Sequence, residues 1–181
     1  MYQQNSKSTI DGRSTEDLFQ KTASKYCYDV FKAATNDDKN KGIDFYLRFG
    51  ALNRAIQVKG PKRVDRNDDE YSTKFTWFEL KNIAGGPGSL MKETDYTALY
   101  MPWVQKFILF STKELREYIV KHVDYSKPPL TKKHGILEWD RYTRSDYGKA
   151  DEIVLVSYEA LRVFYALQEV NYDPNLLVFE V

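Results

Sequence analysis

Two short segments in which apolar and polar side chains alternate constrain the fold more than any other part of the sequence. Residues 43–49 (IDFYLRF) alternate strictly, and residues 54–59 (RAIQVK) resume an alternation after a break of a few residues. A period of two residues predicts β-strands, and a break this short predicts that the strands form an antiparallel hairpin. The apolar side of this hairpin, which would pack on the core, carries Ile43, Phe45, Ile56 and Val58.

The segments around the hairpin predict one amphipathic helix and several polar connections. A helix is expected over 15–34, because apolar side chains recur there at helical spacing and Ser14 or Thr15 can cap the first turn. Residues 1–13 are expected to be flexible, 35–42 (TNDDKNKG) to form a charged turn, and 60–74 to form an exposed loop.

The rest of the chain predicts a mixture of strands and helices. They follow no strict strand–helix–strand order, which favours an α/β fold with a mixed β-sheet flanked by helices. A core is expected over 14–123, with 124–181 as a C-terminal extension packed on the same domain. Strands are expected at 75–81, 96–101, 107–110, 136–142, 152–156 and 176–181, and helices at 112–123 and from Ser157 to about 170.

Composition excludes several classes of protein. The 181 residues suit one domain, and no apolar run approaches the roughly 20 residues needed to span a bilayer, so no membrane partner is expected. One cysteine, Cys27, excludes an internal disulfide, and with only His122 and His134 a structural zinc site is excluded too. Any metal should therefore be a hard ion held by oxygen ligands. A net charge of +1 means that nucleic-acid contact would depend on a local patch or on pairing of subunits.

The polar side chains of the hairpin form the set with a recognisable chemistry. Gln57 and Lys59 are two residues apart on one strand and therefore lie on the same face. With the turn centred on residues 51 and 52, antiparallel pairing brings Asp44 opposite Lys59 and onto that face. Glu16 lies at the N-terminal end of the apolar stripe of the predicted helix, where a carboxylate could overhang the hairpin.

A carboxylate, a second oxygen ligand and a lysine around one point suit the hydrolysis of phosphodiester bonds. Mg²⁺ takes one or two carboxylates, several waters and a substrate phosphate, and it polarises the phosphoryl group and activates water. A lysine can orient that water or neutralise charge that develops on the phosphate. Asp44 and Gln57 are therefore candidate metal ligands, and Lys59 is a candidate catalytic residue.

The order and spacing of these residues resemble the PD-(D/E)XK nuclease superfamily. Glu16 precedes Asp44 by 28 residues and Asp44 precedes Gln57 by 13, a spacing similar to that of Holliday-junction-resolvase-type members. The runs 77–101 and 106–119 are also similar to a nuclease-like family common in phages and large viruses. The resemblance covers about residues 14–122 and implies a restriction-endonuclease-like core.

This resemblance implies a Mg²⁺-dependent endonuclease that acts on DNA, with Mn²⁺ able to substitute. Asp44 would be the main metal ligand and Gln57 the second; Lys59 would position the attacking water, and Glu16 would tune the metal or hold that water indirectly. The superfamily usually has Glu or Asp where this chain has Gln57, so a lower metal affinity is expected. Some active members, including a homing endonuclease, resemble this chain in using glutamine there. The proline of the family motif is replaced by Ile43.

Two alternatives to this assignment stay open. A second set, Asp68 or Asp69 with Glu79 and Lys81, has the same residue types but follows a charged loop with no preceding helix. Taken singly, each residue of the first set also has an ordinary structural role. Glu16 could answer the helix dipole in a first turn, Asp44 could be a turn residue, and Gln57 with Lys59 could be the solvated face of an edge hairpin.

The remaining expectations concern partners. The loop after the hairpin carries Lys62, Arg63 and Arg66, which could contact DNA phosphates, although acidic neighbours dilute its charge. The main alternative function is a nuclease-fold protein without catalysis that serves as a DNA-binding or scaffolding module. Assembly into dimers or tetramers is expected, and the location is expected to be cytoplasmic, in the host cytoplasm if the source is viral.

Overall fold

A computed structural model of the chain describes residues 7–26, 29–49, 51–63, 70–101, 104–131, 137–146, 149–169 and 178–180. The chain divides into two units. The first combines residues 1–71, 94–112 and 172–181, and the second combines 72–93 and 113–171. This division differs from the predicted core of 14–123, because the chain leaves the first unit after residue 71 and returns to it twice.

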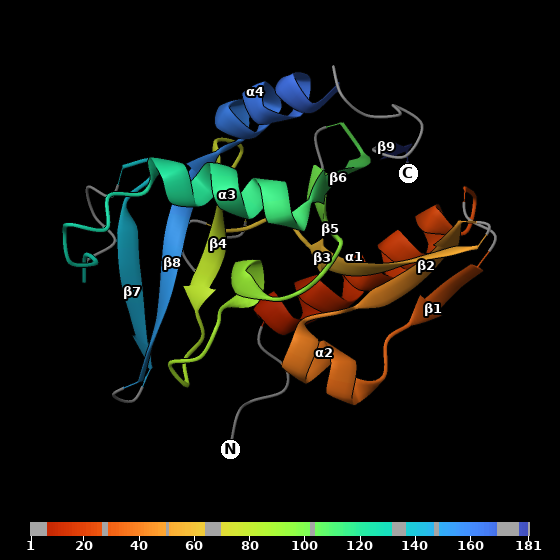
Figure 1. Cartoon of the computed structure of the whole chain (residues 1–181), viewed down its shortest axis with the longest axis horizontal. Coiled ribbons are helices and arrows are strands. Elements are labelled where there is room, and N and C mark those ends of the chain that lie inside the picture. The colour runs from red at the N-terminus through yellow and green to blue at the C-terminus, as the bar shows by residue number, and fades with distance from the viewer. Residues whose placement is uncertain are drawn as a thin grey trace. The chain divides into compact units, whose positions relative to one another are not determined.

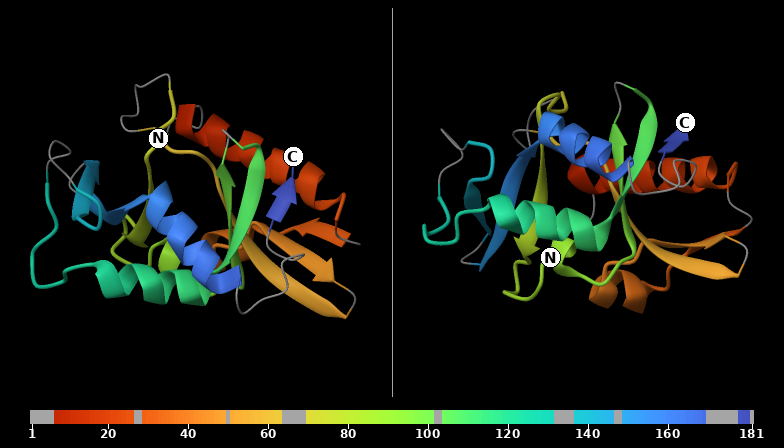
Figure 2. Two further views of the ribbon diagram at one scale, coloured as in Figure 1. Left: turned by 90° about the horizontal axis from the view of Figure 1, so that it is seen from above. Right: turned by 45° about the horizontal axis from the view of Figure 1, so that its top comes forward.

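The first unit contains a mixed sheet of six strands in the order β1-β2-β3-β5-β6-β9. β3 and β5 run parallel, and the other neighbours are antiparallel. Helix α1 runs along one face of the sheet (Figures 1 and 2). The predicted α/β class with a mixed sheet and flanking helices is confirmed. The elements of this unit are α1 (Lys7–Ala23), β1 (Asp29–Lys32), α2 (Thr35–Lys41), β2 (Phe45–Phe49), β3 (Leu52–Lys59), β5 (Tyr96–Met101), β6 (Lys106–Ser111) and β9 (Val178–Glu180).

The core of this unit forms where α1 meets β2, β3, β5 and β6. The predicted apolar side of the hairpin is buried, as expected from its alternation. Two rings of β2 and β6 contact Phe19 of α1, with ring centroids 5.5 and 5.1 Å from its own. The buried cluster consists of Phe19, Ala23, Phe45, Leu47, Ile56, Val58, Ala98, Phe107 and Leu109.

The hairpin has a different register from the predicted one. Phe49 pairs with Leu52 and Phe45 with Ile56, so the turn lies one residue earlier than expected. Beyond the last paired residues, the Asp44 N–H donates to the Ile56 carbonyl at 2.8 Å, and Asp44 Oδ2 accepts the Val58 N–H at 2.6 Å. Asp44 is therefore level with Gln57, and the prediction that it lies opposite Lys59 is wrong.

The predicted helix over 15–34 is also misplaced. Helix α1 begins at Lys7, so most of the stretch expected to be flexible is helical, and it ends at Ala23. Ser14 and Thr15 do not cap it; their hydroxyls donate to the Asp11 carbonyl one turn earlier. The apolar residues within 29–32 continue the helical spacing of the preceding segment by chance, which made the predicted helix too long. These residues form β1, which pairs with β2. Cys27 lies outside the described residues.

The segment expected to be a charged turn is helix α2. It has no apolar side chain to give a helical period, but its charges follow the helix dipole, with acids in the first turn and lysines in the last. Gly42 ends it in the left-handed conformation, at φ 69°, and donates its N–H to the Asp38 carbonyl at 2.9 Å. This C-terminal glycine is the common way to end a helix.

A second glycine allows β3 to approach α1. A Cβ atom at Gly60 would lie 2.7 Å from the Thr15 hydroxyl oxygen, and Thr15 is buried. A side chain at position 60 would therefore require Thr15 to move. This contact holds the end of β3 against the middle of α1. It joins the residue that precedes Glu16 to the residue that follows Lys59.

The second unit is built on an antiparallel sheet in the order β4-β8-β7. Tyr118 of α3 stacks on Phe164 of α4 with centroids 4.7 Å apart, which joins the two helices. The Ser157 hydroxyl accepts the Ala160 N–H at 3.0 Å, as the predicted helix cap requires. β7 begins at Arg141, later than the strand predicted at 136–142. The elements of this unit are β4 (Phe75–Lys81), the 3-10 turn η1 (Ser89–Met91), α3 (Thr112–His122), β7 (Arg141–Asp146), β8 (Lys149–Ser157) and α4 (Tyr158–Glu169).

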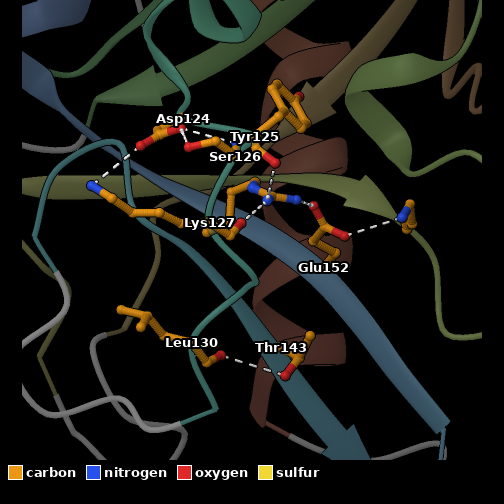
Figure 3. A network of polar contacts seen from close by, with 9 residues as sticks. Asp124, Tyr125, Ser126, Lys127, Leu130, Thr143 and Glu152 are labelled. Atoms are coloured by element: carbon orange, nitrogen blue, oxygen red, sulfur yellow. Dashed lines mark hydrogen bonds and ion pairs between the residues drawn. The ribbon is translucent and has the colours of Figure 1, made fainter.

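A nearly buried ion pair fixes the loop after α3 to this sheet (Figure 3). Arg141 Nη1 lies 2.7 Å from Glu152 Oε1, with the two side chains only 10% and 8% exposed. The other terminal nitrogen of Arg141 donates to the backbone carbonyl of Lys127, and the guanidinium lies 4.6 Å from the centre of the Tyr125 ring. Arg141 therefore connects β7, β8 and the loop through one guanidinium group.

No helix in the described part of the chain is long and apolar enough to cross a membrane.

Removal of one partner of the buried pair should destabilise the protein. In Glu152→Ala the Arg141 guanidinium keeps its burial and loses its counter-charge, so the free energy of unfolding should fall by about 3 kcal/mol. Urea denaturation is the measurement. The control is Glu159→Ala, which breaks the exposed pair between Glu159 and Arg162 and should leave stability nearly unchanged. Equal effects of the two variants would contradict this assignment.

Candidate functional site

Three of the predicted site residues lie on adjacent positions of the hairpin. Asp44 directly precedes β2, and Gln57 and Lys59 belong to the last three residues of β3. β3 is an interior strand between β2 and β5, and Gln57 is only 4% exposed. The interpretation of Gln57 as part of a solvated edge is therefore wrong. The hydrogen bonds of Asp44 with Ile56 and Val58 place it level with Gln57, and Lys59 lies two residues after Gln57 on the same face of β3.

Asp44 is a carboxylate held in place by the backbone. Its Oδ2 accepts the Val58 N–H at 2.6 Å, and its Oδ1 accepts no hydrogen bond from the described part of the chain. Burial raises the pKa of Asp44 to about 6, although the Val58 hydrogen bond and the charge of Lys59 act in the opposite direction. The charges of Glu16 and Asp38 raise this pKa further. The charges that act on Asp44 are therefore those of Lys59 and Glu16, which were expected, and that of Asp38, which was not.

The side-chain amide of Gln57 is hydrogen-bonded through its nitrogen but not through its oxygen among the described residues. Its Nε2 donates to the Gly42 carbonyl at 3.2 Å, whereas its Oε1 is buried and has no hydrogen-bond partner among the described residues. A buried acceptor without a partner costs about 1–3 kcal/mol and calls for a specific cause such as a bound ion.

The two oxygens suit a hard divalent cation. Asp44 offers one carboxylate oxygen that accepts no hydrogen bond from the described residues, and Gln57 offers an amide oxygen. Both are ligand types that Mg²⁺ accepts. No group of three or more His, Cys, Asp and Glu side chains in the described ranges could hold a metal ion. A metal site here would therefore depend on the amide oxygen of Gln57 and would keep most of its ligands as water or substrate.

Glu16 lies in the middle of α1, so the interpretation that it answers the dipole of a first turn is wrong. Its Oε2 forms an ion pair with Lys32 Nζ of β1 at 3.1 Å. Lys32 also lies over the Phe45 ring, 5.9 Å from its centre. Glu16 is therefore tied to the sheet beside the hairpin and acts on Asp44 through its charge rather than by direct contact.

The basic residues after β3 differ in their surroundings. The Arg63 guanidinium donates to both carboxylate oxygens of Asp11, at 3.2 and 3.4 Å, and stacks over Tyr71 at 4.5 Å. Arg63 therefore ties this segment to α1, and a phosphate would have to compete with Asp11 for it. Lys62 is half-buried, and Arg66 lies outside the described residues. Phosphate contact by these residues stays a prediction.

Two residues of the competing set, Glu79 and Lys81, belong to the second unit. Glu79 Oε2 accepts the Ser89 N–H at 3.1 Å and so holds the η1 turn. Lys81 forms an ion pair with Glu152 at 3.3 Å. Asp68 and Asp69 lie outside the described residues. Glu79 and Lys81 therefore both have structural partners, and the choice between the two sets stays a prediction.

Two residues near Asp44 were missed from the sequence. Gly42 supplies the carbonyl that binds Gln57, and Asp38 adds negative charge near Asp44. The signal for both was present, since acids followed by lysines and a glycine are typical of a short helix and its C-terminal end. Because residues 35–41 contain no apolar side chain, hydrophobic periodicity did not indicate a helix there.

Comparison with known proteins gives little further guidance. No protein-family model matches the sequence, and neither does any curated protein. Among solved structures, the chain is similar to the bacterial homing endonuclease I-Ssp6803I, at 11% identity and a TM-score of 0.43, over 92% of this chain and 99% of that chain.

The raised pKa of Asp44 predicts a pH-dependent effect of Asp44→Asn. A carboxylate whose pKa is higher in the folded state, about 6 against 3.8, stabilises the fold at low pH and loses that contribution as pH rises through 6. Asparagine imitates the protonated form. The stability of Asp44→Asn relative to wild type should therefore grow by about 2 kcal/mol between pH 4 and pH 7.

Denaturant unfolding at a series of pH values measures this difference. Asp17→Asn, at an exposed position on α1, is the control for a general change in charge. A difference between Asp44→Asn and wild type that stays constant from pH 4 to pH 7 would show that burial does not raise this pKa.

Proposed function

We propose that this protein is a metal-dependent endonuclease that hydrolyses phosphodiester bonds in DNA. The observation that carries the proposal is the placement of Asp44 level with Gln57, by its hydrogen bonds with Ile56 and Val58, together with the buried Oε1 of Gln57, which has no partner in the described residues. Lys59 follows two residues later on the same face. An acidic ligand, a neutral oxygen ligand and an ammonium group are the groups that a site for a divalent cation and a phosphate requires.

Each residue has a distinct role in the proposed site. Asp44 and Gln57 would hold Mg²⁺, or Mn²⁺ in its place, which supplies Lewis-acid polarisation of the phosphoryl group and activation of water. The Val58 N–H fixes one oxygen of Asp44 and leaves the other for the ion. Lys59 would orient the attacking water or stabilise negative charge on the phosphate. Glu16 would adjust the charge of Asp44 from α1.

The raised pKa of Asp44 limits the pH range of the proposed reaction. Asp44 binds a cation as a carboxylate, and below pH of about 6 it is largely protonated. A bound cation favours the ionised form and lowers this pKa. Metal binding and cleavage should therefore weaken as pH falls below 6, and a higher metal concentration should restore them in part.

A DNA-binding or scaffolding protein with this fold and no catalysis is the second candidate. Its support is the neutral side chain of Gln57, which gives the ion one negative charge fewer than a second carboxylate would. Such a protein would bind DNA without a metal requirement. Assembly into dimers or tetramers and a cytoplasmic location stay predictions in either case.

Cleavage assays with site variants test the proposal. Labelled duplex, single-stranded and four-way-junction DNA would be incubated with Mg²⁺, Mn²⁺ or EDTA. Metal-dependent cutting is expected from the wild type, with a loss on the order of 100-fold or more in Asp44→Asn and Lys59→Met. Lys81→Met, at the competing set, is the matched control and should cut like wild type.

The alternatives give different results in the same assay. Metal-independent binding of DNA by wild type and variants alike, without cutting, would support the scaffolding function. Cutting that survives Asp44→Asn and Lys59→Met but disappears in Lys81→Met would move the active site to β4.

A further inference from the structure

We propose that Gly42 is a positioning residue of this site, and that its carbonyl oxygen orients the amide of Gln57 so that Oε1 serves as a metal ligand. The inference rests on the proposed function and deepens it. It also accounts for a glutamine, rather than an acidic residue, at position 57 of this chain.

The end of helix α2 sets the position of this carbonyl. Gly42 adopts φ 69° and ψ 28°, and its N–H closes the helix on Asp38. A residue with a Cβ atom, alanine included, is strained in this conformation, whereas glycine and, to a lesser degree, asparagine accept it. The chain then turns directly into Asp44 and β2, so the carbonyl of Gly42 lies beside the position of β3 that is level with Asp44.

The contact with Gly42 determines which end of the Gln57 amide is available. An amide has a donor end and an acceptor end, and the Gly42 carbonyl can only accept. The Nε2 group must therefore face Gly42, as the distance of 3.2 Å shows, and the reversed amide would place two oxygens against each other. Oε1 is left as a buried acceptor without a partner in the described chain, which is the group a hard cation requires.

A glutamate at position 57 would not satisfy the same surroundings. It offers two acceptors and no donor when ionised, so one carboxylate oxygen would face the Gly42 carbonyl without a hydrogen between them. The buried position, 4% exposed, makes this arrangement costly. The amide supplies a donor to Gly42 and a neutral oxygen to the ion, and no other side chain of this length does both.

Side-chain exchange measured by NMR tests the contact itself, without metal. The Nε2 protons of Gln57, assigned from their loss in Gln57→Met, should exchange with water at least about tenfold more slowly than those of the exposed Gln105. This protection should disappear in Gly42→Ala and persist in Gly42→Asn, because asparagine tolerates the left-handed conformation. Equal exchange in Gln57 and Gln105 would overturn the inference.

Mn²⁺ affinity measured by calorimetry, well below the unfolding temperature, tests the positioning role. Gly42→Ala should bind Mn²⁺ about tenfold more weakly than wild type, as is usual when the partner of a metal ligand is lost, and Gly42→Asn should recover most of the affinity. A helix cap with a structural role alone would lower the unfolding temperature in Gly42→Ala and leave the affinity of the folded protein unchanged. That result would overturn the inference.

Gln57→Glu gives a third, independent readout. It should cut DNA at least about tenfold more slowly than wild type and unfold at a lower temperature without metal, although it adds a negative ligand. A faster or equally fast variant would overturn the inference.

Failure of the inference and failure of the proposed function are distinguishable. Wild type that binds Mn²⁺ and cuts, with no effect of Gly42→Ala, would remove only the positioning role. Wild type that neither binds Mn²⁺ nor cuts would remove the function and the positioning role together, while the exchange rates would still report the contact between Gly42 and Gln57.

Discussion

The pairing of Phe45 with Ile56 decides both the core and the candidate site. On one face of the hairpin this register buries Phe45 and Ile56 against α1. On the other face it brings Asp44 level with Gln57. Because the period of a strand is two residues, a slip by one residue would exchange the two faces. The burial of the apolar side thus holds the polar residues in place, and the hydrogen bond from Val58 N–H to Asp44 strengthens the same arrangement.

The sequence predicted most accurately the strands in which apolar side chains alternate with polar ones or follow one another in a buried run. The strands at 75–81 and 96–101 were predicted with their observed bounds, because alternating or apolar runs between turn residues leave little choice. The first helix was wrong at both ends, and its C-terminal end was placed too late because the apolar residues of β1 happen to continue its helical period. The short helix α2 has no buried residue, so hydrophobic periodicity could not reveal it. Its stability depends on its charges and on Gly42, which are local signals that a pattern of apolar residues does not contain.

The candidate site followed from residue types and spacing, whereas its geometry did not. Asp44, Gln57 and Lys59 were identified because their chemistry is recognisable in order along two strands. The groups that orient these side chains belong to the backbone. Gln57 donates to a carbonyl 15 residues earlier in the chain, and Asp44 accepts from an N–H 14 residues later. Such partners carry no mark in a sequence, since every residue has a carbonyl and almost every residue has an N–H. The pairing of Arg63 with Asp11 escaped prediction for a related reason, because the two residues are 52 positions apart.

The neutral amide at position 57 has a consequence for the order of events at the proposed site. One carboxylate cannot balance the two charges of a divalent cation, so a phosphate that approaches the site supplies the missing negative charge. Cation and nucleic acid then increase each other's affinity by the same factor, as thermodynamic reciprocity requires. In the absence of nucleic acid the proposed site would bind Mg²⁺ more weakly than in its presence. The glutamine would thereby make the chain a conditional enzyme, whose catalytic centre is completed by its own substrate.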